Sequence, residues 1–384
     1  MKRFFIIIFI FSVLLSDSIY AQTYVAQVKV TGKKWGYITN KGELIIPPIY
    51  EDCYPFSDNL GIVKDPADKN ISYFLNIKGE KIIPEPSKFV LHEIFGYGLD
   101  LILFEDGLIP YKNIEKKFDM KYGNHEVWTY GYLNTSGRIV IPAKYVQVTV
   151  FNDGFAIGKT EIKPVDGKPE AKYYIIDTKG KEIPLKVNVP ESVTYMMNVP
   201  PFYFKHFSEG LASFKTTDDK MGYIDTMGNV AIQPKFESVG YFIGGLAWAR
   251  TSDDKVGYID HSGSWVIKPI FSEAKDFDPA CGMARIEIAK KWAYTDKFGK
   301  ILNVDTEVFG DFNDGLAKGR KKDKIGFFNS KGEWIIQPQF ESARDFKNGY
   351  AAVKQGGKWG VIDTQGKWVI NPTYEAIKDM ELVN

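Results

Sequence analysis

A short turn recurs nine times along the chain and constrains its fold more than any other feature. In each copy a Thr, Asn or Asp follows a strand-like segment, and a Gly stands three positions later. The pairs are Thr39/Gly42, Asn76/Gly79, Asn134/Gly137, Asp177/Gly180, Asp225/Gly228, Asp260/Gly263, Asp296/Gly299, Asn329/Gly332 and Asp363/Gly366. The polar side chain can hydrogen-bond to backbone two residues on, and Gly adopts a positive φ without steric cost. The pattern predicts nine β-hairpins, each with a type I turn and a glycine bulge.

The spacing of the turns predicts one tandem array rather than several domains. From Gly228 onward the turn glycines are 33 to 36 residues apart, whereas the earlier ones are 37 to 58 residues apart. We therefore expect an array over residues 22–384, with insertions in 22–217 and regular repeats in 218–384. A repeat array has a continuous core, so a length of 384 residues does not imply separate domains.

The rest of each unit has a regular order. An aromatic strand such as Trp35-Gly36-Tyr37-Ile38 precedes the turn, and Gly36 leaves room there for a neighbouring ring or backbone. A β run that ends in Pro follows the turn, and Pro is expected to stop ladder pairing because it has no N–H. An aromatic residue and then Phe-x-x-Gly, as at Phe346/Gly349, complete the unit. We expect these rings to pack between adjacent units.

This pattern resembles the WG repeat family, also called KWG repeats, which are bacterial tandem β repeats. The Trp-Gly dipeptide is intact at Trp35-Gly36 and Trp359-Gly360, and it has drifted in the other copies, for example to Trp292-Ala293. The resemblance covers residues 24–384. It implies an all-β protein that is often exported, and it offers no catalytic residues to carry over.

The sequence thus predicts an all-β fold of about nine antiparallel β-meander repeats. Two arrangements are open: an open, curved, propeller-like or solenoid array, and a closed β-propeller. We favour the open arc, because Tyr24–Val30 reads as the first strand of a whole unit, and the truncated last copy is not visibly completed by the start of the chain.

Residues 1–21 have the pattern of a secretory signal peptide. Lys2 and Arg3 precede an apolar stretch at Phe4–Leu15, and Ala21 stands before a predicted cut at Gln22. The apolar stretch is too short for a comfortable membrane span, and no later segment is long and apolar enough. We expect an exported protein that is periplasmic, on the cell surface or secreted, with no membrane span after cleavage.

Charge and cysteine content limit the partners. Removing residues 1–21 leaves 47 basic and 47 acidic residues, from 49 and 48 in the whole chain. Nucleic acid is therefore not an expected partner, because phosphate contact needs a basic excess. Cys53 and Cys281 are expected to be isolated thiols, although an exported protein permits a disulfide between them.

The sequence contains no recognisable catalytic constellation. Four histidines, His92, His125, His206 and His261, show no metal-ligand spacing. Acidic residues such as Asp153, Glu209 and Asp314 recur at one repeat position, which marks them as structural. We predict that the protein is not an enzyme and has no metal, no cofactor and no catalytic residue.

Function in a repeat protein usually resides where a copy departs from the consensus. Four insertions do so, all in the first half: residues 85–103, 110–128, 161–171 and 185–203. The candidate partner-binding residues within them are Tyr195, Met196, Met197, Trp128 and His125.

Two functions remain open from sequence. The first is an exported, non-catalytic binding or scaffold protein of the cell envelope that holds an envelope protein. The second is a carbohydrate-binding or weakly glycan-active envelope protein, in which Trp128, Trp248 and Trp265 are candidate sugar platforms.

Overall fold

The computed structural model describes most of the chain from residue 22 onward. The described residues are 22–30, 32, 34–67, 72–85, 90–91, 103–119, 123–165, 168–187, 189 and 203–383. The predicted signal peptide, residues 1–21, lies outside them and stays a prediction.

The described residues form strands and turns, as the sequence predicts. The strands of the first half are β1 (Thr23–Val30), β2 (Lys34–Thr39), β3 (Leu44–Tyr50), β4 (Leu60–Lys64), β5 (Ser72–Asn76), β6 (Lys81–Ile82), β7 (Val90–Leu91), β8 (Leu108–Asp119), β9 (Gly123–Asn134), β10 (Ile139–Val148), β11 (Phe155–Val165), β12 (Lys168–Asp177) and β13 (Glu182–Pro184). The regular half contains β14 (Leu211–Lys215), β15 (Met221–Asp225), β16 (Val230–Phe236), β17 (Ser238–Val239), β18 (Ala247–Arg250), β19 (Val256–Ile259), β20 (Trp265–Phe271), β21 (Glu273–Ala274), β22 (Met283–Ile288), β23 (Lys291–Asp296) and β24 (Ile301–Leu302). The last part of the chain adds β25 (Phe309–Asn313), β26 (Leu316–Lys321), β27 (Lys324–Asn329), β28 (Trp334–Phe340), β29 (Ser342–Ala343), β30 (Tyr350–Gln355), β31 (Lys358–Asp363), β32 (Trp368–Tyr374), β33 (Ala376–Ile377) and β34 (Glu381–Val383). Across all the residues that the structure describes, no helix is long and apolar enough to cross a membrane.

The nine predicted turns close nine hairpins, and their geometry is the predicted one. The Asp225 carboxylate accepts hydrogen bonds from the amides of Met227 at 2.9 Å and Asn229 at 2.8 Å. Gly228 has a φ of 83° and donates its amide to the Asp225 carbonyl oxygen at 3.0 Å. The local chemistry of the turn residues therefore sets the position of each hairpin.

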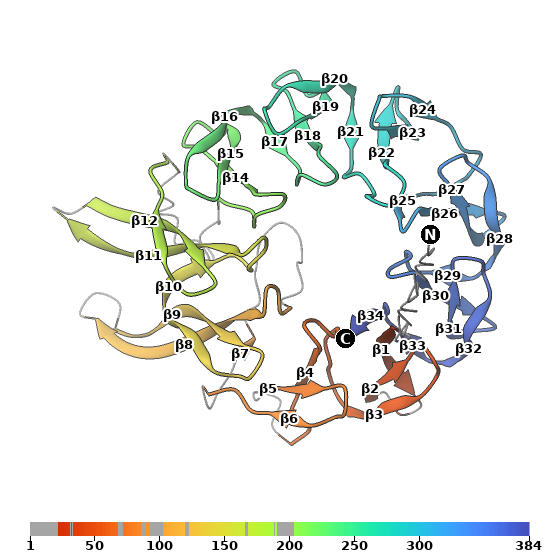
Figure 1. The fold of residues 1–384 in the computed structure, drawn as a ribbon, viewed down its shortest axis with the longest axis horizontal. Coiled ribbons are helices and arrows are strands. Elements are labelled where there is room, and N and C mark those ends of the chain that lie inside the picture. The colour runs from red at the N-terminus through yellow and green to blue at the C-terminus, as the bar shows by residue number, and fades with distance from the viewer. Residues whose placement is uncertain are drawn as a thin grey trace, which may run out of the picture.

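Each hairpin belongs to one blade of a ring (Figure 1). The outer strand of one blade leads directly to the inner strand of the next, and only Ser272 separates β20 from β21. β10 continues from one blade into the next without a break, so its first half pairs with β9 and its second half with β11. Two blades thereby merge into one seven-stranded sheet, which runs from β7 to β13.

The ring is closed, so the second of the two predicted arrangements is present rather than the open arc. β32 is followed by β33 and β34, and both of these strands pair antiparallel with β1. A hydrophobic cluster spans this seam and includes Val28, Ile38, Val361 and Ile377. The last copy is therefore continued into the first blade by strands of two and three residues, which are too short to show a sequence period.

The hydrophobic core lies between adjacent blades. One cluster, for example, joins Tyr223, Ile232 and Phe236 of one blade to Phe242 and Ile259 of the next. The Phe of Phe-x-x-Gly is buried in these junctions, as Phe346 is, at 2 % exposure. The expectation that regularly placed rings pack between units is confirmed.

The Gly of Trp-Gly is required by a bulge in the outer strand. A Cβ on Gly257 would lie 2.4 Å from the Ile267 carbonyl oxygen and 2.7 Å from the Pro269 nitrogen. The outer strand bulges at this point, because Val256 pairs with Phe271 while Tyr258 pairs with Ile267. Where the outer strand is bulged in this way, the Pro lies within it and pairing resumes past the Pro, which corrects the expectation that Pro ends the pairing. The expectation holds for β6 and β13, which end at or before Pro84 and Pro184.

The bulge and the glycine occur together in the same units. Six units have both, with glycines at Gly36, Gly131, Gly222, Gly257, Gly326 and Gly360. The other three have Tyr73, Tyr174 or Ala293 at this position, and their outer strands are two or three residues long and pair without a register shift. The side chain at this position thus decides which form of outer strand a blade can have.

Candidate functional site

The β8–β9 hairpin projects from the ring (Figure 1), and its two strands are the longest in the described part of the chain. β8 and β9 are 12 residues each, and they pair without interruption from Leu108↔Asn134 to Asp119↔Gly123. The base of the hairpin is buried, with Ile109 and Leu133 both at 0 % exposure, whereas residues 114–118 are exposed. The insertion predicted at 110–128 therefore forms an arm on a rigid base.

Three large apolar side chains are exposed on this arm. Ile114 is 41 % exposed, Phe118 is 72 % exposed and Trp128 is 37 % exposed. Ile114 pairs directly with Trp128, and Phe118 is four residues along the same strand, so the period of two places all three on one face. Burial within the ring does not account for them.

Polar groups hold the Trp128 ring in place. Its Nε1 donates to the Glu126 carboxylate at 3.1 Å, and the Lys112 Nζ lies 4.4 Å from the ring centroid. One face of the indole is therefore covered by an ammonium group, a cation–π contact. Trp128 is an exposed but orientated residue, as a contact surface requires.

The other predicted site residues are only partly placed by the structure. The backbone of His125 pairs with Lys117 on the same arm, three positions from Trp128, and its side chain is not described. Tyr195, Met196 and Met197 lie outside the described residues. The predicted residues that the structure brings together are thus Trp128 and the backbone of His125. Trp248 and Trp265 are partly buried against blade-junction clusters.

A second hairpin, β11–β12, projects on the same side of the ring (Figure 1). Its tip is the insertion predicted at 161–171, where Lys163 pairs with Glu170 and Val165 with Lys168. Only the backbone of this tip is described. Both arms extend from the seven-stranded sheet, so two of the four insertions form one irregular edge of an otherwise regular ring.

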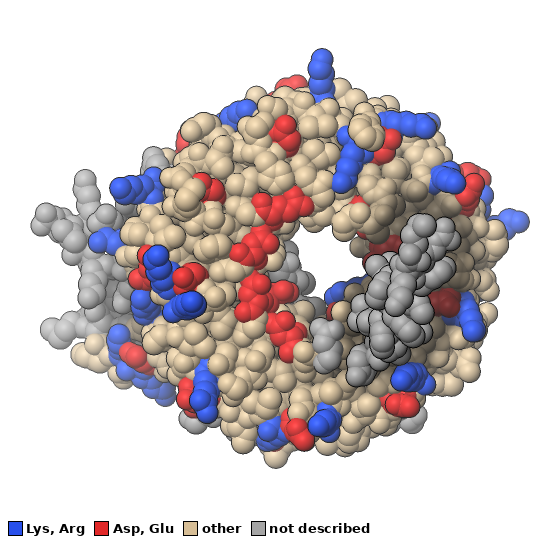
Figure 2. All heavy atoms as spheres, viewed as in Figure 1, with Lys and Arg blue, Asp and Glu red and all other residues tan. Residues whose placement is uncertain are grey.

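An open channel passes through the middle of the ring, and acidic side chains line part of its rim (Figure 2). At the inner turns, a carboxylate of one blade accepts a hydrogen bond from the backbone amide of a glycine in the inner turn of a following blade. These contacts, all between 2.5 and 2.8 Å, are Asp58 to Gly107, Asp106 to Gly154, Asp153 to Gly210, Glu209 to Gly244, Asp278 to Gly315 and Asp314 to Gly349. The recurring acids therefore join adjacent blades, which confirms the structural role expected for Asp153, Glu209 and Asp314.

A second acidic position, missed in the sequence, lies in or just after the inner strands of the regular half. Asp276, Asp311, Asp345 and Asp379 recur every 34 or 35 residues, each directly before Phe277, Phe312, Phe346 or Met380. Burial raises the pKa of Asp276 and of Asp311 above the ordinary value. The signal available in the sequence was the regular spacing of these residues, because each copy places an Asp directly before a large apolar residue of the core.

These acids meet cations of the preceding blade. Asp311 pairs with Arg285 at 2.9 Å, Asp345 with Lys318 at 3.1 Å and Asp379 with Arg344 at 2.5 Å. The Arg344 contact is bidentate, with a second bond of 2.7 Å from Nη2. The regular half therefore carries a series of ion pairs that link adjacent blades.

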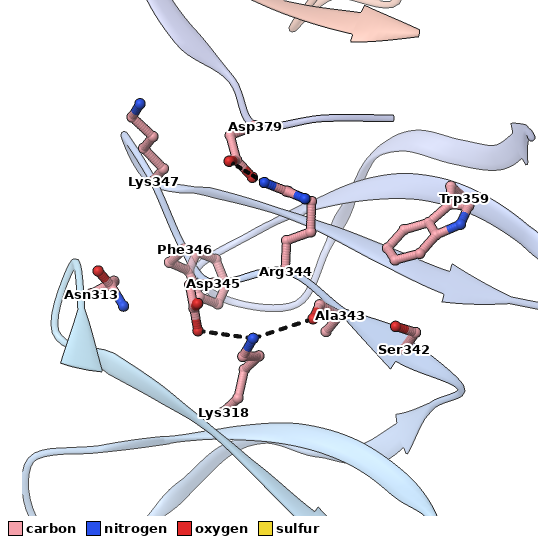
Figure 3. Close-up of a pocket in the computed structure, with 10 residues that line it drawn as sticks. All are labelled: Asn313, Lys318, Ser342, Ala343, Arg344, Asp345, Phe346, Lys347, Trp359 and Asp379. Atoms are coloured by element: carbon pink, nitrogen blue, oxygen red, sulfur yellow. Dashed lines mark hydrogen bonds and ion pairs between the residues drawn. The ribbon is translucent and has the colours of Figure 1, made fainter. Parts of the chain in front are cut away.

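A groove of about 560 Å³ opens among these pairs (Figure 3). Three units contribute to it: Asn313 and Lys318 from one blade, residues 342–347 and Trp359 from the next, and Asp379 from the tail that closes the ring. In Figure 3, Trp359 and Asn313 lie at opposite ends, with both ion pairs between them. The lining is mostly polar, with two aromatic side chains, Trp359 at one end and the buried Phe346.

The histidines and cysteines do not form a metal site in the described part of the chain. His206 stacks on Tyr241 at 4.3 Å, and His261 stacks on Phe242 and pairs with Glu209 at 3.2 Å. Among the described residues no group of three or more His, Cys, Asp or Glu could hold a metal ion. Cys53 and Cys281 are free thiols, as expected, and burial raises the pKa of each to about 12.

Comparison with solved structures shows the fold at low sequence identity. A crystal structure titled as the eukaryotic initiation factor has a TM-score of 0.54 and 9% identity, over 94% of this chain and 98% of that one. AztD from Citrobacter koseri has a TM-score of 0.38 and 12% identity, over 94% and 97%. BamB from Moraxella catarrhalis has a TM-score of 0.33 and 13% identity, over 73% and 90%. A search of curated proteins by sequence finds no match.

The closed ring of β-meander blades defines a propeller-like repeat protein. The family described as WG containing repeat matches residues 35–65, 130–159, 221–255, 257–292, 325–359 and 359–381. Each of these six matches begins at, or one residue before, the glycine of a unit that has the bulge. The chain belongs to the WG repeat family.

Proposed function

We propose that this is an exported, non-catalytic binding protein of the cell envelope that holds a protein partner on the β8–β9 arm. The observation that carries the proposal is the exposed face of Ile114, Phe118 and Trp128 on that arm. Exposed apolar residues grouped on one projecting element are typical of interaction surfaces. The regular ring supplies a rigid support for them.

The chemistry of the arm favours a protein partner that presents both apolar and polar groups. Aromatic residues are enriched at the core of protein interfaces, and Trp residues are enriched among the strongest contributors to affinity. Lys112, Lys116 and Glu126 lie on the same face as the apolar side chains, and the cross-strand positions Lys116 and Glu126 stand between Trp128 and Phe118. A partner would place apolar side chains against Phe118 and polar groups against these charged residues.

Site-specific photo-crosslinking in the native cell tests the contact. A photoreactive phenylalanine analogue replaces Phe118, and the matched control places it at Phe298, which is 92 % exposed on a turn of the regular half. We expect one discrete protein to be linked from position 118 and not from position 298. The same products from both positions, or none from position 118, would contradict the proposal.

A second experiment separates loss of binding from loss of folding. The double variant Ile114→Ser and Phe118→Ser removes the apolar face without touching the buried base. We expect capture of the crosslinked partner to fall at least tenfold while the melting temperature is unchanged. The control variant Phe298→Ser should retain capture.

Export is tested separately by the N-terminus of the protein isolated from its own cell. We expect Gln22 as the first residue and recovery outside the cytoplasm, because residues 1–21 have the pattern of a cleaved signal. A protein that retains residues 1–21 and fractionates with the cytoplasm would contradict the export part of the proposal and leave the crosslinking test unaffected.

A further inference from the structure

The groove beside the ring seam carries an inference that is independent of the arm. We propose that it binds a neutral, polyhydroxylated ligand, such as a segment of a glycan, with one sugar ring against Trp359. Its residues lie in the last two blades and the tail, so the arm and the groove can be tested separately.

The charges of the groove compensate one another. Lys318 pairs with Asp345 at 3.1 Å, and Arg344 pairs with Asp379 through two bonds of 2.5 and 2.7 Å. The third cation, Lys347, pairs with Glu381 at 2.8 Å. An anionic or cationic ligand would find each opposite charge already compensated and would be repelled by the like charge beside it, which disfavours it. A neutral ligand meets neither obstacle.

Paired charges still offer directed hydrogen bonds. An ionised carboxylate has about four lone-pair sites and a guanidinium has five N–H donors, so the bidentate Arg344–Asp379 pair leaves acceptors and donors over. Asn313 and Ser342 add an amide and a hydroxyl to the lining. Hydroxyl groups, which both donate and accept, are the ligand chemistry that fits such a mixed set.

Trp359 supplies the apolar part of the site. It lies at one end of the groove and is half-buried, with its ring packed partly against the seam cluster. A sugar ring has apolar C–H faces, and the negative face of an indole attracts the positive edge of such C–H groups. The volume of about 560 Å³ is within the range of sites that bind small ligands.

The closed ring is a condition for this site. Asp379 lies between β33 and β34, which are held on β1, and it fixes the Arg344 side chain across the groove. In an open array this carboxylate would have no fixed position. The site thus depends on the pairing of the C-terminal strands with β1.

Isothermal titration of the purified protein tests the proposal, with a neutral trisaccharide panel of maltotriose, cellotriose and N-acetylchitotriose. Trigalacturonate, deacetylated chitotriose and tri-alanine serve as anionic, cationic and peptide probes. We expect at least one neutral sugar to bind, and to bind at least tenfold more tightly than any charged sugar. Preference for a charged sugar, binding of the peptide alone, or no binding by any probe would overturn the proposal.

Variants then place the binding in the groove. Asn313→Ala and Trp359→Phe should each weaken the best neutral sugar about tenfold or more, which corresponds to about 1.4 kcal/mol. Trp35→Phe is the matched control, because Trp35 has the same repeat position but lies near Lys29 and Lys378, outside the groove. Melting temperatures of all three establish that they fold. Equal weakening by Trp35→Phe, or no weakening by the groove variants, would refute the assignment.

Discussion

Five tyrosine hydroxyls connect each of their blades to the next. Tyr37, Tyr132, Tyr223, Tyr258 and Tyr294 donate to backbone carbonyl oxygens 16 or 17 residues later, at 2.7 or 2.8 Å. The acceptors lie in the segment that enters the following blade, in or just outside its inner strand, and burial raises the pKa of all five hydroxyls. One side chain therefore packs the core and satisfies a backbone group that the junction would otherwise bury unpaired.

We expect Tyr258→Phe to lower the free energy of unfolding by about 1–2 kcal/mol, because it leaves the Lys275 carbonyl oxygen without this donor. Chemical denaturation measures the loss. Tyr24→Phe is the control, since its hydroxyl bonds only the exposed Gln22 side chain among the contacts described, and it should change stability by less than about 0.5 kcal/mol. Equal effects of the two variants would assign the stability to the rings alone.

The buried Asp276 carboxyl makes stability depend on pH. Burial raises its pKa above the ordinary value of 3.8, although Lys205 and a hydrogen bond from Trp248 act in the other direction, and Asp311 adds to the rise. The folded chain therefore binds this proton more tightly than the unfolded chain. Its contribution to stability is largest below pH 3.8 and falls as the pH rises through the raised pKa.

Asp276→Asn removes this titration. We expect the variant to have a higher melting temperature than the parent at pH 7 and a smaller or reversed difference near pH 4, because Asn carries no charge to bury. Melting temperatures from pH 4 to pH 8 measure the difference. A variant that is less stable than the parent only at pH 7 would show that Lys205 and Trp248 favour the charged form.

At the scale of the element, one glycine decides the shape of a whole outer strand. Units with Gly before the central residue of the aromatic strand have an outer strand of 7 or 10 residues with a bulge, whereas Ala293 accompanies a strand of two residues, Ile301–Leu302. The bulged backbone approaches the Gly Cα so closely that no side chain fits. The repeat can therefore drift in its Trp and keep its Gly.

We expect Gly257→Ala to destabilise the protein by about 2–3 kcal/mol, because its Cβ would meet backbone atoms at 2.4 and 2.7 Å that cannot move aside as a side chain would. The control is Ala293→Gly at the same repeat position, where no bulge approaches and a loss of about 0.5–1 kcal/mol is expected from backbone entropy alone. Thermal and denaturant unfolding of both variants give the comparison. Similar losses for the two would argue against steric exclusion.

At the scale of the whole molecule, residues 376–383 close the ring. In β33, β34 and the segment between them, Ile377, Met380 and Val383 are at 3 % exposure or less, and Glu381 pairs with Lys347. Without them the β1 edge would be exposed, and an unpaired edge strand invites pairing with another chain. The seam is thus the point at which the continuous core depends on both ends.

Deletion of residues 376–384 should lower the free energy of unfolding by roughly 5–9 kcal/mol, the sum for three buried apolar side chains at about 1.5–3 kcal/mol each. We expect a lower melting temperature and self-association in size-exclusion chromatography. Thr373→Ala, an exposed change on β32, is the control and should leave both unchanged. A monomeric, equally stable truncated chain would show that the ring does not need its seam.

Much of the fold was predictable because it depends on interactions between residues that are close in the sequence. The Asp225 turn, the aromatic strand and the Phe of Phe-x-x-Gly recur at a fixed phase, and each acts through neighbours within one unit or the next. Of the candidate site, the insertion at 110–128 could be located, because it interrupts the repeat, and so could Trp128. The acidic position of Asp276 and Asp311 was equally periodic, but its pairing partners lie on another blade.

The sequence by itself determined the all-β class, the nine hairpins, the blade-to-blade core and the WG repeat family. Turn residues and strand alternation act over short range, so they can be recognised in the sequence alone. Only the tertiary structure decided that the ring closes, that the Pro runs bulge over the Gly, and that Lys318, Arg344, Trp359 and Asp379 share one groove. Ring closure and the groove depend on contacts between segments far apart in the chain, such as Ala376 with Lys29, and no local pattern encodes them. The bulge forms within one hairpin, but the close approach of its backbone to the Gly is visible only in three dimensions.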